Sequence, residues 1–274
     1  MKVKELPVAI ARTWGLRSKP VSKLLSPDKR EVPVVISLTT IESRLASVDL
    51  VIRSLMDQTI RPYKILLWVN EKLEGRIPNK LARLQSTLFE IRYTPLEISH
   101  KKLIHTLALY PDLAIITCDD DLMYRKTWLA KLFESSVQHP NTILANQIRA
   151  IQLNEKGQFL PYAQWPVNSQ VEKDPRKIVT IGAEGVLYPP HSLDSRFDDK
   201  ALFMQLAPKA DDLWFKCMSL LKGTPCKLAE DRPKNAVPIM GSQKISLKNV
   251  NIKKDYNSKQ WAALVAHFKL DLSN

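Results

Sequence analysis

The first part of the chain alternates short apolar segments with segments of helical periodicity, and this alternation restricts the fold more than any other feature. Runs rich in Val, Ile and Leu, typical of buried strands, occupy residues 33–39, 64–69, 90–93 and 113–117. Between them, apolar side chains recur at helical spacing in residues 45–56, 78–88 and 100–109. Strands that alternate with helices predict a parallel sheet with right-handed crossovers.

The period changes after residue 121, which indicates a mixed second part. A hairpin is predicted around Asn154-Glu155-Lys156-Gly157 (between residues 142–153 and 159–162), and a further strand within residues 177–188. Helices are predicted over 210–221, with Gly223 in the C-cap position, and over 260–268. We therefore divide the chain into a basic N-terminal segment, an α/β half and a mixed half, which span residues 1–31, 32–124 and 125–274.

Composition narrows the class of protein. With 274 residues, of which 45% are hydrophobic, the chain can bury the core of one large domain or two small ones. The net charge of +13 suggests an anionic partner, namely nucleic acid, a nucleotide or a membrane surface, but the scattered basic residues do not resemble a nucleic-acid-binding arm. Only seven glycines occur, and neither a G-x-G-x-x-G nor a P-loop motif is present, which argues against a Rossmann dehydrogenase or a P-loop NTPase.

The cysteines and the N-terminal segment indicate where in the cell the protein is expected. Three cysteines without a Cys-x-x-Cys pair make a disulfide framework or zinc ribbon improbable and favour the cytoplasm. We expect neither a signal peptide nor a transmembrane helix, because the apolar stretches are too short. The basic segment also carries Trp14, Leu16, Leu24 and Leu25, so it could lie on an anionic membrane surface. The alternatives are a poorly ordered terminus and a helix packed on the domain.

An acidic run, Cys118-Asp119-Asp120-Asp121, follows the strand predicted at 113–117. Ligands bind at the carboxyl ends of strands in open α/β sheets. Because side chains alternate along a strand, we expect Asp119 and Asp121 to point the same way and Asp120 to point elsewhere. Neighbouring carboxylates repel unless a cation shares them, and Mg²⁺ or Mn²⁺ prefers such oxygens. The alternative is a solvated acidic turn that caps the next helix.

Several sequence segments in a fixed order resemble bacterial glycosyltransferases of the GT-A fold, in particular those like family 2. They are Val35-Ile36-Ser37-Leu38-Thr39-Thr40 with Ser54-Leu55-x-x-Gln58-Thr59, Lys64-Ile65-Leu66-Leu67-Trp68, Lys101-Lys102-Leu103 with Tyr110-Pro111-Asp112, Asp119-Asp120-Asp121, Gly182-Ala183-Glu184-Gly185-Val186-Leu187-Tyr188-Pro189-Pro190, and Ala210-Asp211-Asp212-Leu213-Trp214-Phe215. The resemblance extends from about residue 33 to residue 268. It implies an α/β fold with a GT-A-like Rossmannoid sheet that binds a nucleotide-sugar, helices on both faces, and a mixed acceptor-binding half.

The resemblance implies an enzyme that moves a sugar, as hexosyltransferases do, from a nucleotide diphosphate-sugar (a UDP-sugar is favoured) to a hydroxyl of a polysaccharide or glycolipid. Such an enzyme would act in bacterial capsule or lipopolysaccharide synthesis, in the cytoplasm or at the inner face of the membrane, without nucleic acid as a partner. A Mn²⁺ or Mg²⁺ ion would neutralise the diphosphate leaving group. The resemblance makes Asp121 the direct metal ligand, Asp119 a ribose contact or second ligand, and Asp120 a further residue of the donor site, with a mainly structural role.

Other residues near the predicted strand ends are candidates for donor binding. Arg44, Lys101 and Lys102 could bind the diphosphate, although each could equally be a solvated helix charge. Thr39 and Thr40 end the first strand and could contact the base or ribose, but Thr also suits a strand end for structural reasons alone.

Asp211 and Asp212 form a second acidic site. An inverting transferase needs a carboxylate that accepts the proton of the attacking hydroxyl, and similar enzymes place it at the start of a helix downstream of the D-x-D motif. We favour Asp212 as this base. The alternative is that the pair caps the helix and interacts with its dipole.

The acceptor site is expected around Gly182, Glu184 and Gly185, with Trp165 stacking on a sugar ring. The glycines would permit close approach of the backbone to a sugar, although a β-bulge would explain them as well. A tryptophan is also a common core residue.

Two other classes of protein remain open. A sugar nucleotidyltransferase shares a similar sheet and acidic metal site, but usually carries a Gly-rich basic signature near its first strand, where this chain has Ser37-Leu38-Thr39-Thr40. A non-catalytic basic module would bind polyanions or membranes in a strongly salt-dependent way, without needing a divalent cation.

Overall fold

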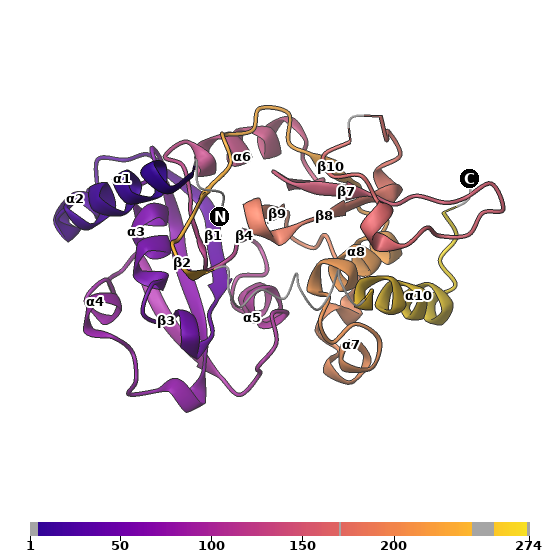
Figure 1. Ribbon diagram of the computed structural model, residues 1–274, viewed down its shortest axis with the longest axis horizontal. Helices are drawn as coiled ribbons and strands as arrows, with labels where there is room; N and C mark the ends of the chain where they lie inside the picture. Colours follow the sequence, from indigo (N-terminus) through magenta and orange to yellow (C-terminus); the bar gives the residue numbers. More distant parts are fainter. Residues whose placement is uncertain (1–4, 170, 243–254, 273–274) are drawn as a thin grey trace.

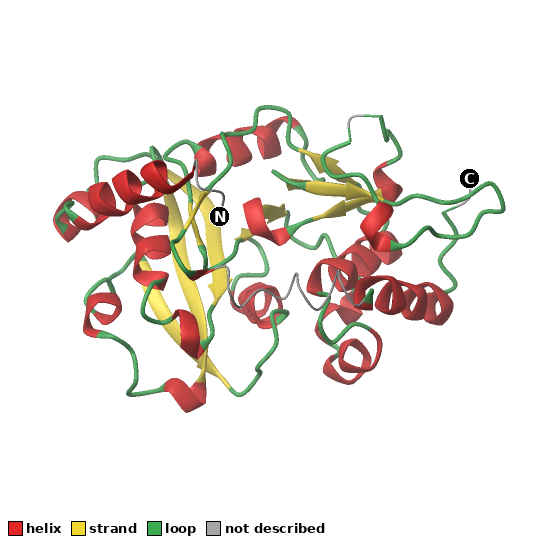
Figure 2. Ribbon diagram, in the orientation of Figure 1, coloured by secondary structure: helices red, strands yellow, loops and turns green. Residues whose placement is uncertain are grey.

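The computed structural model describes residues 5–169, 171–242 and 255–272. Its centre is a seven-stranded sheet (Figures 1 and 2). The strands are β1 (Glu31–Thr39), β2 (Arg61–Asn70), β3 (Phe89–Thr94), β4 (Ala114–Thr117), β6 (Ile143–Ala145), β9 (Val186–Tyr188) and β10 (Cys226–Leu228). They lie side by side in the order β10-β6-β9-β4-β1-β2-β3.

The sheet is mostly parallel, as the sequence predicts. β3, β2, β1 and β4 pair in parallel, with Ile36 of β1 opposite Ile65 on one side and Ile116 on the other. β9 is antiparallel to both β4 and β6, while β10 and β6 are again parallel. Strands from the second part of the chain therefore extend the same sheet beyond β4.

Helices cover both faces of the sheet (Figure 2). They are α1 (Leu6–Arg17), α2 (Val21–Leu24), α3 (Val48–Met56), α4 (Asn79–Ala82), α5 (Lys101–Leu109), α6 (Trp128–Gln138), α7 (Lys200–Leu206), α8 (Asp211–Lys222) and α10 (Tyr256–Phe268). Of the helices in the part of the chain that the structure describes, none combines the length and the apolar character needed to cross a membrane.

Alternating strand side chains divide the core into two layers. Ile36, Leu67 and Ile116 face one layer with α1, α3 and α6, whereas Val35 and Leu66 face the other with α5, α8 and α10. Successive side chains of a strand point to opposite faces, so a sheet with two covered faces needs nearly continuous apolar strands. This explains the unbroken apolar runs of the sequence.

Three local predictions need correction. The helix predicted at 78–88 is only the single turn α4, because Ser86 turns the chain by bonding with Phe89. The predicted hairpin has its turn at residues 154–157, but its arms share only the bridge between Leu153 and Phe159. The strand β7 (Ile148–Ala150) pairs instead with β8 (Ile178–Thr180), so residues 177–188 hold two strands, β8 and β9.

A small antiparallel pair follows the acidic run. β5 (Leu122–Met123) pairs with β11 (Val237–Pro238), and the Ile239 amide donates to the Asp121 carbonyl at 2.9 Å. The chain segment before residue 242 is thereby held against the carboxyl end of β4.

Candidate active site

The carboxyl ends of β1 and β4 lie at one edge of the sheet. Ser37 is opposite Thr117 in the parallel register, and the Cys118 amide continues the ladder by donating to the Ser37 carbonyl at 3.2 Å. The threonines that end β1 and the carboxylates that follow β4 therefore meet at this edge, as expected for a ligand site in an open α/β sheet.

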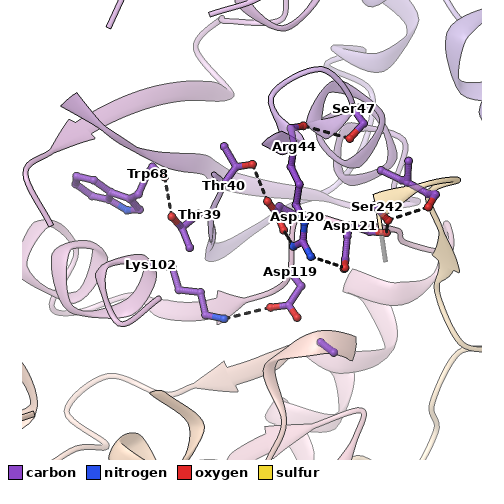
Figure 3. Close-up of polar contacts among 12 residues, drawn as sticks. Thr39, Thr40, Arg44, Ser47, Trp68, Lys102, Asp119, Asp120, Asp121 and Ser242 are labelled. Atoms are coloured by element: carbon purple, nitrogen blue, oxygen red, sulfur yellow. Dashed lines mark hydrogen bonds and ion pairs between the residues drawn. The ribbon is translucent and has the colours of Figure 1, made fainter. Parts of the chain in front are cut away.

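Asp120 and Asp121 form an ion-pair cluster with Arg44 (Figure 3). Arg44 Nη1 binds Asp120, and Arg44 Nη2 lies 3.1 Å from Asp121 Oδ2. Thr40 Oγ1 donates to Asp120 Oδ2 at 2.6 Å. The predicted alternation of the three carboxylates is therefore wrong, because β4 ends at Thr117 and the run turns away from extended geometry.

Asp119 lies on the other side of this turn, next to Lys102 of α5 (Figure 3). Lys102 Nζ is 3.3 Å from Asp119 Oδ1 and also 3.3 Å from Asp211 Oδ2 at the start of α8. The Lys102 side chain is only 7% exposed, whereas that of Asp119 is 39% exposed. One buried ammonium thus bridges two acidic segments that are far apart in the sequence.

The turn Gly182–Glu184 completes this cluster. The Gly182 amide donates to Asp212 Oδ1 at 3.1 Å. A Cβ atom at Gly182 would lie 3.1 Å from Lys102 Nζ and 3.3 Å from Asp212 Oδ1. The absence of a side chain here lets Lys102, Asp119 and Asp212 converge.

The cluster holds one ammonium, that of Lys102, among the three carboxyls of Asp119, Asp211 and Asp212. This arrangement shifts the pKa values of Lys102, Asp211 and Asp212. Burial acts against the Lys102 ammonium, but Asp211, Asp119 and Asp212 together raise the pKa of Lys102 well above its usual value. Burial also opposes ionisation of Asp211, yet Lys102 and His100 lower its pKa. Burial and the charge of Asp211 raise the pKa of Asp212 well above its usual range. Two neighbouring carboxyls with divergent pKa values are typical of an acid–base site.

Polar contacts hold α5, which carries Lys102, against the sheet. Ser37 Oγ donates to the Lys102 carbonyl and lies 2.8 Å from Thr106 Oγ1. Trp68 Nε1 of β2 donates to the same Thr106 oxygen at 2.8 Å. These buried contacts orient the first turn of α5, which positions Lys102.

The carboxylates of Asp119 and Asp121 fit a hard divalent cation. Burial, followed by the charge of Asp119, raises the pKa of Asp121 to about 6, although Arg44 acts in the opposite direction. Among the described residues, no three His, Cys, Asp or Glu side chains form a ready-made metal cage. A Mg²⁺-like site often uses only one or two carboxylates and takes its other ligands from water and substrate phosphates.

Two aromatic residues that the sequence did not single out organise the turn. Tyr124 Oη accepts from the Asp119 amide at 2.9 Å and donates to the Ala183 carbonyl at 2.8 Å. Trp128 Nε1 donates to the Glu184 carbonyl at 2.7 Å. The contacts with Ala183 and Glu184 have no local sequence signature, because they join residues 59 and 56 positions apart in the chain.

The structure also argues against the capping alternatives. The N-cap of α8 is Ala210, and Asp212 accepts from the amide of Gly182 in another element. The helix after the acidic run, α6, has Thr127 as its N-cap, well beyond Asp121. Neither acidic segment therefore supplies an N-cap, but Asp211 and Asp212 lie in the first turn of α8, so the dipole interaction of the alternative remains.

Several donor candidates have other partners. Thr39 Oγ1 donates to the Trp68 carbonyl at 2.9 Å, so it stabilises the strand end. Asp120 is buried and bound by Thr40 and Arg44, which gives it a structural role and leaves Arg44 facing carboxylates instead of an open phosphate site. Lys101 is buried, not solvated, and burial lowers its pKa to about 8 despite the charge of Glu97.

The acceptor candidates are dispersed. Trp165 is 1% exposed and packs against Trp261 in the core, which leaves no free ring face for a sugar. Glu184 Oε2 accepts from the Ala236 amide at 3.0 Å, so this side chain anchors the segment before β11. Gly185 adjoins the indole of Trp128, and a Cβ there would come within 2.6 Å of Trp128 Cζ2. Of this group, Gly182 alone lies against the Lys102 cluster in the described part of the chain.

No protein-family model and no curated protein matches the chain. Among solved structures, the chain is similar to the mannosyltransferase PcManGT from Pyrobaculum calidifontis in complex with GDP-Man and Mn²⁺, with a TM-score of 0.53 and 10% identity over 96% of this chain and 73% of that chain. 4-Diphosphocytidyl-2C-methyl-D-erythritol synthase from Anaerococcus prevotii matches with a TM-score of 0.49 and 10% identity, over 89% of this chain and 100% of that chain. The first likeness and the seven-stranded, mostly parallel sheet confirm the predicted fold class: the chain has a GT-A-like α/β fold of the nucleotide-binding kind.

Proposed function

We propose that the protein is a glycosyltransferase that moves a sugar from a nucleoside diphosphate-sugar to a hydroxyl of a glycan or glycolipid. One observation carries this proposal: the two acidic segments meet around Lys102 and Gly182 at the carboxyl edge of the sheet. The fold alone would allow many functions, so the argument depends on this site.

Asp212 is the proposed general base. Its raised pKa makes it a stronger proton acceptor than an ordinary carboxylate, and the Gly182 amide holds one of its oxygens in place. Lys102 neutralises Asp211 beside it, which separates the roles of the two carboxyls. Asp212 would accept the proton of the acceptor hydroxyl while the oxygen of that hydroxyl forms a bond to the anomeric carbon of the sugar. The bond from this carbon to the diphosphate would break at the same time, so the nucleoside diphosphate would leave and the configuration of the anomeric carbon would be inverted.

Asp119 and Asp121 are the proposed residues for the donor side. When bound, a divalent cation would neutralise the diphosphate leaving group as a Lewis acid. Asp119 is exposed enough to reach a ligand, and Asp121 contributes a second carboxylate from the same turn. That the similar mannosyltransferase was solved with GDP-Man and Mn²⁺ supports a divalent cation on the donor side.

Donor binding is tested first, by thermal shift with UDP-sugars and GDP-sugars in the presence and absence of Mn²⁺. A ligand that binds only the native state raises its melting temperature. We expect a shift for one nucleotide that requires Mn²⁺ and is lost in Asp121→Asn. If no nucleotide shifts the melting temperature under either condition, the proposal is wrong.

Turnover is tested by release of nucleoside diphosphate in the presence of glycan acceptors. Asp212→Asn should lower the rate by about 10²–10⁴-fold while the donor-induced thermal shift remains. Asp199→Asn is a matched control, because Asp199 also lies at a helix start and accepts from the Leu202 amide, but it caps α7 itself. Equal rates in Asp212→Asn and Asp199→Asn would exclude Asp212 as the base. Release of pyrophosphate would instead identify a sugar nucleotidyltransferase.

A further inference from the structure

The outer face of α1 is apolar and exposed. Ala9 and Leu16 on the inner face are buried against the domain, whereas Leu6, Ile10 and Trp14 recur every fourth residue on the outside. Trp14 is 74% exposed and Ile10 is 51% exposed. Residues spaced by four lie on one side of a helix, so these three form a continuous stripe.

This pattern is unusual for a helix at a protein surface. Such a helix normally presents polar side chains to water, and a helix that is apolar on all sides is normally buried. α1 lies at the outside of α3 (Figure 1), and Arg53 of α3 donates to the Leu16 carbonyl at 3.2 Å. The inner face of α1 is therefore packed against the domain, whereas the apolar side chains of its outer face are exposed.

We propose that the outer face of α1 docks on an anionic membrane surface. Exposed cations follow the stripe directly: Arg17 in the last turn of α1 and Lys23 in α2, neither of which forms an ion pair with another described residue. Apolar side chains that insert beside Lys and Arg are typical of helices that lie in the interface of a bilayer with anionic lipids.

The dimensions of α1 favour this partner over a second copy of the chain. Its 12 residues correspond to a helix about 18 Å long, too short to cross the roughly 30 Å of a bilayer core but suited to lying on it. The outer face covers roughly 200 Å² in projection, far below the about 800 Å² per partner of a stable protein interface.

Contacts of α1 lead directly to the candidate active site. Arg12 Nη2 donates to the Tyr124 carbonyl at 2.8 Å, and the Tyr124 hydroxyl bonds to Asp119 and Ala183. A cavity of about 280 Å³ also opens beside the first turn of α1 and is lined by Val8 and Arg125 among others. A docked α1 would hold this edge of the site at the bilayer, so the acceptor would be a membrane-held glycolipid; this last step rests on the proposed function.

Trp14 provides the probe for the test. All six tryptophans lie within the described residues, and the other five are buried. Quenching of tryptophan fluorescence by acrylamide therefore reports mainly on Trp14. Vesicles of phosphatidylcholine with about a third phosphatidylglycerol should protect it and shift its emission to shorter wavelength, whereas pure phosphatidylcholine should do so far less.

Sedimentation with the same vesicles measures binding. The double variant Ile10→Ser, Trp14→Ser should bind at least tenfold more weakly, and Val137→Ser, at an exposed apolar residue of α6, should bind like the wild type. Equal binding of the double variant and the wild type, no binding to anionic vesicles, or protection of Trp14 by dimerisation without vesicles would each overturn the proposal.

Donor binding separates this proposal from the proposed function. The double variant should keep the Mn²⁺-dependent thermal shift without vesicles, because neither residue touches the site. If the protein binds vesicles but no nucleotide, the proposal that α1 docks on a membrane stands and only the proposed glycosyltransferase function is refuted. Transfer to a soluble acceptor at full rate, with no gain for a vesicle-held glycolipid, would refute the acceptor assignment alone.

Discussion

Gly185 and Gly182 look equivalent in the sequence, but replacing each by alanine should have opposite consequences. Gly185 has a φ of +103°, which L-residues rarely adopt, and an added Cβ would lie 2.6 Å from Trp128 Cζ2. The backbone conformation costs about 1–3 kcal/mol for a residue with a side chain. Overpacking against a buried indole costs about 1–3 kcal/mol more.

We therefore expect Gly185→Ala to lose about 2–6 kcal/mol of unfolding free energy. For a chain of this size the melting temperature should fall by roughly 10 °C. Differential scanning calorimetry measures this loss, and urea unfolding checks it independently. Trp128→Phe combined with Gly185→Ala should recover part of the stability, because the smaller ring makes room for the new methyl group.

Gly182→Ala is the matched control. Its Cβ would meet Lys102 Nζ at 3.1 Å and Asp212 Oδ1 at 3.3 Å, which small shifts of side-chain ends can relieve. The melting temperature should change little, but turnover should fall by roughly tenfold or more because the base and the ammonium move apart. A Gly185→Ala protein that melts within about 3 °C of the wild type would refute the steric argument.

Three further substitutions test the electrostatics and the supports of the site. Burial lowers the pKa of His100 to about 4, below its value of about 6.5 in an unfolded chain, so the unfolded state binds more protons as the pH falls through this range. Between about pH 7 and about pH 5, the unfolding free energy of the wild type should therefore fall by about 2 kcal/mol more than that of His100→Phe. Urea unfolding at both pH values measures this, and a difference between the two proteins that does not change with pH would contradict the prediction. Lys102→Met should lose about 3–5 kcal/mol of unfolding free energy near neutral pH, and less near pH 5, where the uncompensated carboxyls can take up protons. The same series of urea unfolding experiments tests this. A loss that grows on acidification would exclude the ion-pair explanation. Tyr124→Phe should lose about 1–3 kcal/mol of unfolding free energy, because the Asp119 amide and the Ala183 carbonyl each lose a hydrogen-bond partner. Calorimetry and the turnover rate are the measurements, and wild-type values in both would show that the hydroxyl is dispensable.

The sequence was a good guide wherever the signal is local. The apolar runs that became β1, β2, β3 and β4 had to be buried on both faces, and only a parallel sheet covered by helices does this. Gly223 ends α8 with a left-handed C-cap, as its position predicts. The acidic run also lies at the carboxyl end of its strand, because strand length and direction follow from the pattern.

Local pattern was misleading where the chain leaves regular structure. The alternation expected for Asp119, Asp120 and Asp121 requires an extended strand, but β4 ends before them. The helix predicted after Pro78 has the right apolar spacing, yet a turn at Ser86 leads directly into β3. In both cases the spacing of side chains is compatible with more than one backbone path.

By itself, then, the sequence determined the strand–helix order, the sheet edge and the residue types available there, because hydrophobic periodicity acts over a few neighbouring residues. Tertiary structure alone decided the partners: Arg44 with Asp120 and Asp121, Lys102 with Asp119 and Asp211, and Gly185 against Trp128. Those pairs join elements that are distant in the chain, and their geometry depends on how the helices pack across the sheet. The same packing covers one side of α1 and leaves Trp14 exposed on the other, which helical periodicity could not decide because apolar side chains occur on both faces of this helix.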